Sequence, residues 1–570
     1  MLNPTKFEDL FASDDATYEI PPYQRAYAWT KKQLNQLLTD LREQPQGKDY
    51  YLGHFLLERP DPKKKSYYVI DGQQRLTTVA LFFSCLIAEL EKRIAGGAEL
   101  IDVDGGPVEL WRWQERYLMR RSVRRFRTVA EDDEYFHRAF VKRMPDAEPN
   151  PARQSQQRLQ DAQRVLQEAL AEETDPATLL RWAHLLATAS VSAFEETDKV
   201  RATQIFAFQN DRGIKLTTLE KLKAYLMHRA YLDDTTNGAA RTIEHVERVF
   251  ADIYARTEEI RLGEDTVLRY HNVAFGPSWE DAFENVKRGL RRAGPDEKAD
   301  WITAYCDSLR RSFYVVREIE HLAAGNSNVT GLLFLRAEDN WPLILKIERY
   351  HSRDRAQCEA LYRLMEIINF KFEFSTGAYR SHDFHAVAKN YAGEAPKLRE
   401  TLLEQAHNGF RDWWAFTQWF DDHLQGNNHY HRVTRYLLWQ YENHLRRQSP
   451  NGRPVAGADF LNVWEQNNWE QTLDHITPQN PVGVTYTKEF RETRLHNLGN
   501  LALLMQGPNA RKNNTLPHEY PEIFSESPYL ADREIASVLH AEGQWGESQI
   551  LVRKQRIVDF AKAYWAVPAN

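Results

Sequence analysis

The 570-residue sequence predicts a mostly helical protein with smaller α+β parts toward both ends. Three observations predict this class. The centre of the chain carries apolar residues at helical spacing, as in Cys358, Leu361 and Met365. The two flanking regions each carry a short run of strand-forming residues beside a polar turn, at 66–70 and at 472–475.

Composition limits the class of protein. Apolar residues make up 42% and charged residues 27%, with a net charge of -7, which are ordinary values for a globular chain and exclude a collagen-like or largely disordered one. The widely spaced Cys85, Cys306 and Cys358 cannot form a disulfide framework or a four-cysteine zinc site. No run approaches the roughly 18 apolar residues of a membrane helix, and the N-terminus lacks a signal pattern. We therefore expect a cytoplasmic protein with no membrane partner.

Turn signals predict three domains, at 1–235, 236–430 and 431–570. This number suits a chain of this length, because domains usually hold roughly 100–200 residues. The first domain begins with short apolar runs and becomes helical. The second is mostly helix, broken by Asn-Gly and Gly-Pro pairs, and carries no recognisable chemistry. The third contains the most informative polar motif.

The first domain contains a strand, a glycine turn and a helix within 68–78, read as YVIDGQQRLTT. Such a turn directs unpaired backbone N–H groups and the positive end of the helix dipole at one place, which suits phosphate. Arg75 adds a fork of donors in the first helical turn. Asp71 could hold a magnesium ion, orient a water or bind a ribose hydroxyl. The plainer alternative is a capping aspartate beside a surface arginine.

Four stretches of this domain, within 5–230, resemble a known family. They read IPPYQRAYAW, YYLGHFLLE, VIDGQQRLTT and FAFQNDRGIKLTTLEKLKAYL, and they look like the N-terminal domain of the GmrSD-type restriction endonucleases, which is similar to the ParB/sulfiredoxin superfamily. The resemblance implies that the domain binds and hydrolyses a nucleoside triphosphate and senses modified DNA. The glycine turn of this domain is not a Walker P-loop, because no GxxxxGK[ST] is present. The residues that the resemblance assigns to nucleotide binding are Gln24, Arg25, Asp71, Gly72, Gln73, Gln74, Arg75, Asn210 and Gly213.

The polar motif of the third domain comprises TLDHITP at 472–478, LHNLGNLALL at 495–504 and the NARK that begins at Asn509. Asp474 and Asn509 offer hard oxygen ligands for Mg²⁺. His475, with an ordinary pKa of about 6.5, can deprotonate a water near neutral pH. Phosphodiester hydrolysis needs such a base and such a cation. The alternative is that the motif has no catalytic or metal-binding role and is a surface Asp-His pair followed by an Asn turn.

The order of these residues resembles an HNH (ββα-metal) nuclease, and it is closest to the GmrSD-type C-terminal domain. By that resemblance His475 is the general base, and Asp474 and Asn509 hold Mg²⁺ or Mn²⁺. Asn500 stiffens the loop that orients His475, and Lys512 contacts a phosphate of DNA.

Two points about this motif stay open. His496 and Asn497 lie close enough to compete for the same roles. The segment also lacks the zinc-binding cysteine pairs of many HNH proteins, so we expect it to depend on packing against the preceding helices.

A basic and aromatic stretch at 111–127 is a candidate DNA-binding surface. It interleaves arginines with tryptophan and tyrosine, a mixture that suits phosphate contact and base stacking. The alternative is a solvated helix face paired with the acidic residues at 131–133. The predicted DNA contacts are Arg120, Arg121, Arg124 and Arg125.

Together the motifs predict a modification-dependent (type IV) endonuclease that cuts double-stranded, modified phage DNA. The first domain would bind a nucleoside triphosphate, the helical middle would couple it to the nuclease, and the third domain would cut. SspE-type proteins share this plan, so the modification recognised stays open, as does a homo-oligomeric assembly. Two alternatives are a nucleotide-gated DNA-binding switch with a non-cleaving HNH module and a ribonuclease toxin.

Overall fold

The computed structural model describes most of the chain, which divides into two compact units. Unit 1 holds Met1–Leu268 and Glu280–Tyr314, and unit 2 holds Arg269–Trp279 and Val315–Asn570. The predicted domain boundaries near 235 and 430 stay a prediction. The described residues are 5–45, 47–98, 100–101, 106–142, 150–197, 217–232, 238–276, 281–335, 337–376, 384–409, 416–450, 452–465, 471–505 and 512–568.

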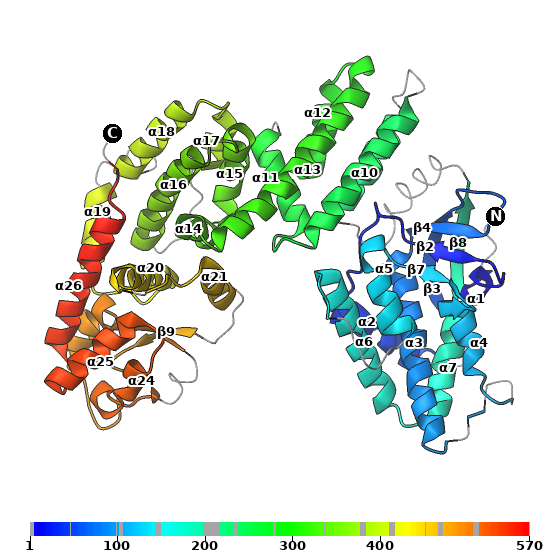
Figure 1. Ribbon diagram of the computed structural model, residues 1–570, viewed down its shortest axis with the longest axis horizontal. Helices are drawn as coiled ribbons and strands as arrows, with labels where there is room; N and C mark the ends of the chain where they lie inside the picture. The colour runs from blue at the N-terminus through cyan, green and yellow to red at the C-terminus, as the bar shows by residue number, and fades with distance from the viewer. Residues whose placement is uncertain are drawn as a thin grey trace. The chain divides into compact units, whose positions relative to one another are not determined.

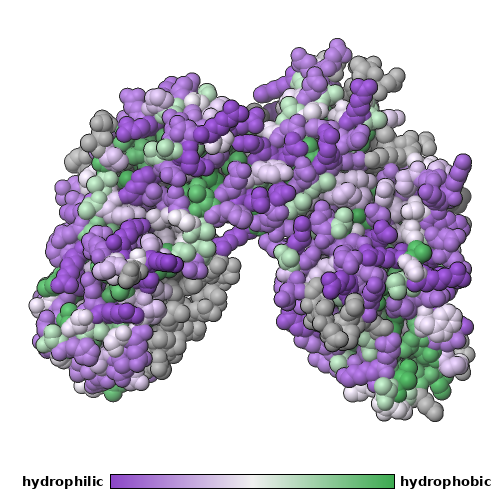
Figure 2. All heavy atoms as spheres, viewed as in Figure 1, coloured by the Kyte–Doolittle hydropathy of each residue, from purple (hydrophilic) through white to green (hydrophobic). Residues whose placement is uncertain are grey.

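Helices make up most of both units (Figure 1), which confirms the predicted fold class. The described strands form one six-stranded sheet and two two-stranded sheets. None of the helices in the described part of the chain has the length and apolar character needed to cross a bilayer. Figure 2 shows hydrophilic side chains over most of the visible surface of each unit, with small apolar areas among them.

Unit 1 is built around a mixed sheet with the strand order β1-β8-β3-β4-β2-β7. The central strand β3 runs antiparallel to β4 and parallel to β8, and β2 runs parallel to β4. The strand predicted from 66–70 is confirmed as β4. The bounds are β1 (Thr5–Lys6), β2 (Thr17–Glu19), β3 (Tyr51–Glu58), β4 (Ser66–Asp71), β7 (Phe126–Arg127) and β8 (Ser190–Glu196), with a separate ribbon of β5 (Met119–Arg120) and β6 (Val123–Arg124).

Helix α3 (Gln73–Ala95) is the core element of unit 1. It follows β4 directly, and apolar side chains around most of its circumference are buried, including Phe82 and Leu86. The turn before it needs Gly72, whose φ of 94° is left-handed and whose added Cβ would lie 2.6 Å from Cδ1 of Phe55. The predicted buried helix after the glycine turn is therefore confirmed.

The other helices of unit 1 cover this core or follow it in the chain. They are α1 (Phe7–Leu10), α2 (Lys31–Glu43), α4 (Leu110–Trp113), α5 (Ala130–Phe136), α6 (Gln154–Glu172), α7 (Pro176–Ala187), α9 (Thr218–Leu232), α10 (Ala239–Thr257) and α12 (Ala282–Arg292), with π-helical turns at Gln114–Leu118 and His137–Val141 and a 3-10 turn at Pro295–Glu297. Helices α11 (Glu264–Phe275) and α13 (Lys298–Ala323) contribute residues to both units.

The helical part of unit 2 is organised around α16 (Arg355–Thr376). The predicted stripe of Cys358, Leu361, Met365 and Ile368 is buried along it. The ring of Trp565 stacks on the ring of Phe370 with their centroids 3.6 Å apart. The remaining helices in this part are α14 (Ser327–Phe334), α15 (Ala337–His351), α17 (Phe384–Asn390), α18 (Ala395–Asn408), α19 (Phe416–Gln425), α20 (Arg432–Gln448) and α21 (Gly457–Glu465).

The rest of unit 2 is an antiparallel pair, β9 (Gln471–His475) and β10 (Leu501–Met505), with helices packed on it. The turn before β10 is covered by α26 (Glu547–Tyr564), because an added Cβ on Gly499 would lie 1.9 Å from the carbonyl oxygen of Ile550. Arg553 also donates to the carbonyl oxygens of Gly499 (3.1 Å) and Leu501 (2.7 Å). The other elements are α22 (Lys488–Phe490), a π-helical turn at Arg491–Leu495, 3-10 turns at Leu498–Asn500 and Pro517–Glu519, α24 (Glu522–Ser525) and α25 (Leu530–Glu542).

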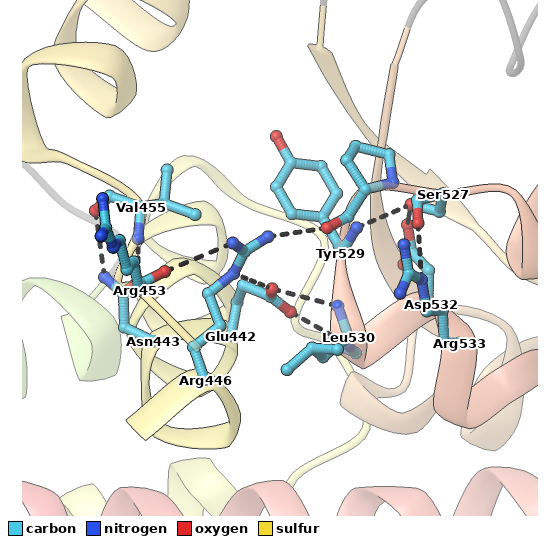
Figure 3. A network of polar contacts seen from close by, with 12 residues as sticks. Glu442, Asn443, Arg446, Arg453, Val455, Ser527, Tyr529, Leu530, Asp532 and Arg533 are labelled. Carbon is cyan, nitrogen blue, oxygen red and sulfur yellow. Dashed lines mark hydrogen bonds and ion pairs between the residues drawn. The ribbon is translucent and has the colours of Figure 1, made fainter. Parts of the chain in front are cut away.

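A buried carboxylate on α20 joins this region to the helical part of unit 2 (Figure 3). Oε1 of Glu442 accepts from Nε of Arg446 (2.5 Å) and the backbone N–H of Leu530 (3.0 Å), and Oε2 accepts from the N–H of Ala531 (2.8 Å). The side chain therefore caps the N-terminus of α25 from a neighbouring helix. Beside it, Asp532 accepts a 2.6 Å hydrogen bond from the hydroxyl of Ser527.

Asp532 makes the stability of unit 2 depend on pH. Burial raises its pKa from 3.8 to about 7, so over that interval the folded chain keeps a proton that the unfolded chain releases. The free energy of unfolding should therefore fall as the pH rises through this range. Asp532→Asn, which keeps an acceptor for Ser527, should reduce this fall when thermal unfolding is followed from pH 4 to pH 8. The exposed Asp559→Asn is the control, and an equal pH dependence in both variants would contradict the assignment.

Candidate functional site

The predicted Asp-His motif lies at the end of β9. His475 pairs with Leu501 and Asp474 with Ala502 across the two strands, so their side chains leave the ladder on opposite faces. His475 is 1% exposed, whereas the carboxylate of Asp474 is partly exposed. The pairing therefore places a buried imidazole beside a more accessible oxygen ligand.

The imidazole of His475 has a partner at each ring nitrogen. Nε2 lies 2.9 Å from Nδ1 of His496, and Nδ1 lies 3.2 Å from Nε2 of Gln479. The ring of Tyr430 packs 4.5 Å from the His475 ring and 5.9 Å from the His496 ring. Burial, and then the proximity of His496, lowers the pKa of His475 to about 4. The ring is therefore uncharged at neutral pH and can accept a proton.

Asn500 holds the loop that follows His475. Its Oδ1 accepts from the N–H of Thr477 (2.9 Å), and its Nδ2 donates to the carbonyl oxygens of Thr477 (3.2 Å) and Leu495 (2.9 Å). The backbone carbonyl of Asn500 also accepts from the N–H of Ile476 (2.8 Å). These contacts are those expected of a residue that fixes the loop beside His475.

Lys512 lies inside this site. Its buried ammonium group donates to Oδ2 of Asp474 (2.6 Å) and to the carbonyl oxygen of His475 (2.5 Å). The predicted contact of Lys512 with a phosphate of DNA stays a prediction. Asn509, the other predicted metal ligand, lies outside the described residues. Over the described ranges no group of three or more His, Cys, Asp and Glu side chains could hold a metal ion.

Two polar residues near the motif have structural partners. Nδ1 of His429 accepts from the N–H of Leu498 (3.2 Å), and Nε2 donates to the carbonyl oxygen of His423 (2.9 Å). The side chain of Asn497 accepts from the N–H of Gly499 (3.0 Å). Asn497 therefore caps the turn formed by Leu498–Asn500.

The second candidate site lies where β4 meets α3 in unit 1. The guanidinium group of Arg75 donates to the carbonyl oxygen of His54 (2.5 Å), lies 3.6 Å from the carboxylate of Asp71 and stacks over Phe55 at 5.6 Å. Gly53 makes room for it, because an added Cβ there would lie 3.0 Å from Cζ of Arg75. Burial raises the pKa of Asp71, although the charge of Arg75 opposes this rise.

The glutamines of the motif tie its loops together. Nε2 of Gln24 donates to the carbonyl oxygen of Ile70 (2.9 Å). Gln74 accepts from the N–H of Ala28 (2.8 Å) and donates to the carbonyl oxygen of Ala26 (3.0 Å). Through these bonds the IPPYQRAYAW loop is held against the DGQQR turn. Gln73, also in this turn, is buried.

Two further cations belong to this loop or contact it. The guanidinium group of Arg25 lies 3.7 Å from the carboxylate of Glu264, and Nζ of Lys223 on α9 donates to the carbonyl oxygen of Tyr23 (2.9 Å). Burial lowers the pKa of Lys223 to about 8, with Glu220 the first of the nearby carboxylates that oppose this fall. Both cations therefore lie among carboxylates, which include Glu220 and Glu264. Asn210 and Gly213 lie outside the described residues.

The sequence interpretation missed three residues that contact these sites. Lys223 could have been found as a lysine inside the apolar stripe of α9, next to Leu222. Tyr430 lies in a His-Tyr-His run far along the chain from the Asp-His motif. Gln479 follows that motif closely, but a glutamine in a loop carries no signal of its own.

The basic stretch at 111–127 is used largely within unit 1. Arg125 is 1% exposed and donates to the carbonyl oxygens of Phe11, Ser13, Asp14 and Arg116, so its predicted DNA contact is wrong. Arg124 pairs with Asp133 and Glu134, and Arg120 pairs with Asp14 and Glu115. Arg121 adopts a left-handed φ of 53° in the turn between β5 and β6. For Arg120 and Arg124, the ion pairs favour the alternative to DNA binding, in which the arginines are paired with acidic side chains of the protein itself.

Comparison with known families places both sites within matched regions. Residues 7–227 match the GmrSD restriction endonuclease, N-terminal domain. Residues 414–560 match the GmrSD restriction endonucleases, C-terminal domain. A search among curated proteins found no match.

Asn500→Ala should loosen the loop beside His475. The change leaves the N–H and carbonyl of Thr477 without their buried partner, which costs about 2 kcal/mol or more. We expect a lower thermal unfolding midpoint and faster hydrogen exchange at Thr477. The exposed Asn428→Ala is the control. Unchanged exchange at Thr477 would show that the side chain does not hold this loop.

Proposed function

The chain belongs to the GmrSD restriction endonuclease family, and from this membership we propose that it is a modification-dependent endonuclease of antiviral defence. DNA is the substrate that a restriction endonuclease implies. In the proposal, an HNH site in unit 2 cuts the DNA and a site in unit 1 binds and hydrolyses a nucleoside triphosphate. We place its action in the cytoplasm, where modified phage DNA would be met.

The observation that carries the cleavage function is the uncharged imidazole of His475 beside the carboxylate of Asp474. As a water attacks the phosphorus atom, its proton passes to the imidazole and a new P–O bond forms. The bond from phosphorus to the leaving oxygen breaks, and that oxygen takes a proton from solvent. His475 thereby acts as the general base. Asn500 keeps the loop beside this ring in place.

The donor set of the motif fits a hard divalent cation. Mg²⁺ binds few protein groups and keeps several waters, so the carboxylate of Asp474 and the amide of Asn509 would suffice to hold Mg²⁺ or Mn²⁺. Asp474 already accepts the positively charged group of Lys512 at 2.6 Å, which supports its use as a cation ligand. When bound, the cation would stabilise negative charge on the phosphate and the leaving oxygen.

Three features support the nucleotide site in unit 1. The uncapped N-terminus of α3 follows Gly72 and suits a phosphate. Arg75 and Arg25 are held by carboxylates for which a phosphate group would compete. Lys223 adds a positive charge behind the loop that carries Tyr23. Together they favour a polyphosphate over an uncharged ligand.

His475→Ala should abolish DNA cleavage. Removing the general base lowers the rate by at least about 100-fold, while DNA affinity measured by gel shift should not change. The assay uses plain, glucosylated-hydroxymethylcytosine and phosphorothioate DNA, each with and without Mg²⁺ and a nucleoside triphosphate. Cleavage of a modified DNA without cleavage of plain DNA would support modification dependence.

Other outcomes of this assay separate the alternatives. Equal cutting of plain and modified DNA would overturn the dependence on modification. A wild-type protein that binds every DNA but cuts none would instead be the nucleotide-gated binding switch. Degradation of cellular RNA on expression without phage would identify a ribonuclease toxin.

Arg75→Ala should abolish triphosphate hydrolysis, because it removes the donor fork beside the N-terminus of α3. Phosphate release is measured for each of the four common ribonucleoside triphosphates. Arg164→Ala, an exposed arginine on α6, is the matched control and should hydrolyse at the wild-type rate. Unchanged turnover in Arg75→Ala would remove the nucleotide site from this position.

A further inference from the structure

The two ring nitrogens of His475 differ in what surrounds them. Nε2 faces His496, which is half-buried, and Nδ1 faces Gln479, which is exposed. A neutral imidazole has one N–H donor and one acceptor nitrogen, and its partners decide which is which. The tautomer of the base can therefore be read from its neighbours.

The neighbours select one arrangement. The amide nitrogen of Gln479 only donates, so Nδ1 of His475 accepts and the ring proton sits on Nε2. That proton points at Nδ1 of His496, 2.9 Å away, which must accept it. His496 in turn carries its own proton on Nε2.

His496, the partner at Nε2 of His475, is held in place, whereas Gln479, the partner at Nδ1, can be replaced. The backbone carbonyl of His496 accepts from the N–H of His429 (2.8 Å), and the ring of Tyr430 stacks on the His496 ring with an interplanar angle of 29°. Gln479 is exposed to solvent. A water can therefore take the place of its amide at Nδ1 without disturbing the bond at Nε2.

We propose that His496 is a positioning residue, which holds His475 in the tautomer whose Nδ1 takes the proton from the attacking water. The inference rests on the proposed cleavage function. When Nδ1 has received the proton, His475 is an imidazolium that still donates from Nε2 to His496. The same bond therefore holds the orientation of the ring before and after the proton transfer. The proton stays on His475 until solvent removes it.

Two variants of His496 separate positioning from packing. In His496→Asn the side-chain oxygen can lie near the position of Nδ1 and accept, whereas His496→Leu fills the space without an acceptor. Loss of such a supporting partner lowers activity by about 10- to 100-fold. The single-turnover cleavage rate should fall by that factor in His496→Leu and recover most of it in His496→Asn. DNA affinity and the thermal unfolding midpoint should not distinguish the two variants.

The tautomer itself provides a readout without metal, DNA or cleavage. Nitrogen-15 NMR of histidine-labelled protein distinguishes Nε2–H from Nδ1–H rings, and the signals of His475 are identified by their loss in His475→Gln. We expect the Nε2–H form in the wild-type protein and in His496→Asn. In His496→Leu the signals should shift toward a mixture of the two forms.

Equal cleavage rates in His496→Leu and His496→Asn, or a His475 tautomer that does not respond to His496→Leu, would overturn the inference and leave the nuclease assignment intact. Undiminished cleavage by His475→Ala would instead remove the nuclease assignment, and the positioning role with it.

Discussion

The pairing of β9 with β10 is the constraint on which the candidate active site depends. Its register places His475 opposite Leu501, so Asn500 stands immediately before the partner strand and reaches across to Thr477. One backbone ladder thereby places both His475, the proposed base, and the side chain that fixes its loop. A shift of one residue would turn His475 to the other face and separate it from His496.

In the proposed nucleotide site, three cations are held in place by oxygen partners. Arg25, Arg75 and Lys223 each lie against carbonyl or carboxylate oxygens, and the pKa of Lys223 falls to about 8 because it is buried. Groups held in this way lose little conformational freedom when an anion replaces a carboxylate partner. Gln24 and Gln74 fix the backbone of the two loops that meet there.

Local chemistry made much of this predictable from the sequence. The strand at 66–70, the glycine turn at Gly72 and the buried stripe of α16 follow from short-range spacing, and the structure confirms them. Arg125 was misplaced, because an arginine beside tryptophans does not reveal whether backbone carbonyls will surround it. Those partners, Phe11 among them, come from segments far away in the sequence.

The close approach of α26 to the turn before β10 has a consequence for synthesis of the protein in the cell. Gly499 lies against the carbonyl of Ile550, and Arg553 bonds to the carbonyls on either side of Asn500. A nascent chain that has emerged only as far as β10 lacks these contacts, so the candidate active site stays incomplete while translation continues. The order of synthesis thus delays completion of this site until α26 has left the ribosome.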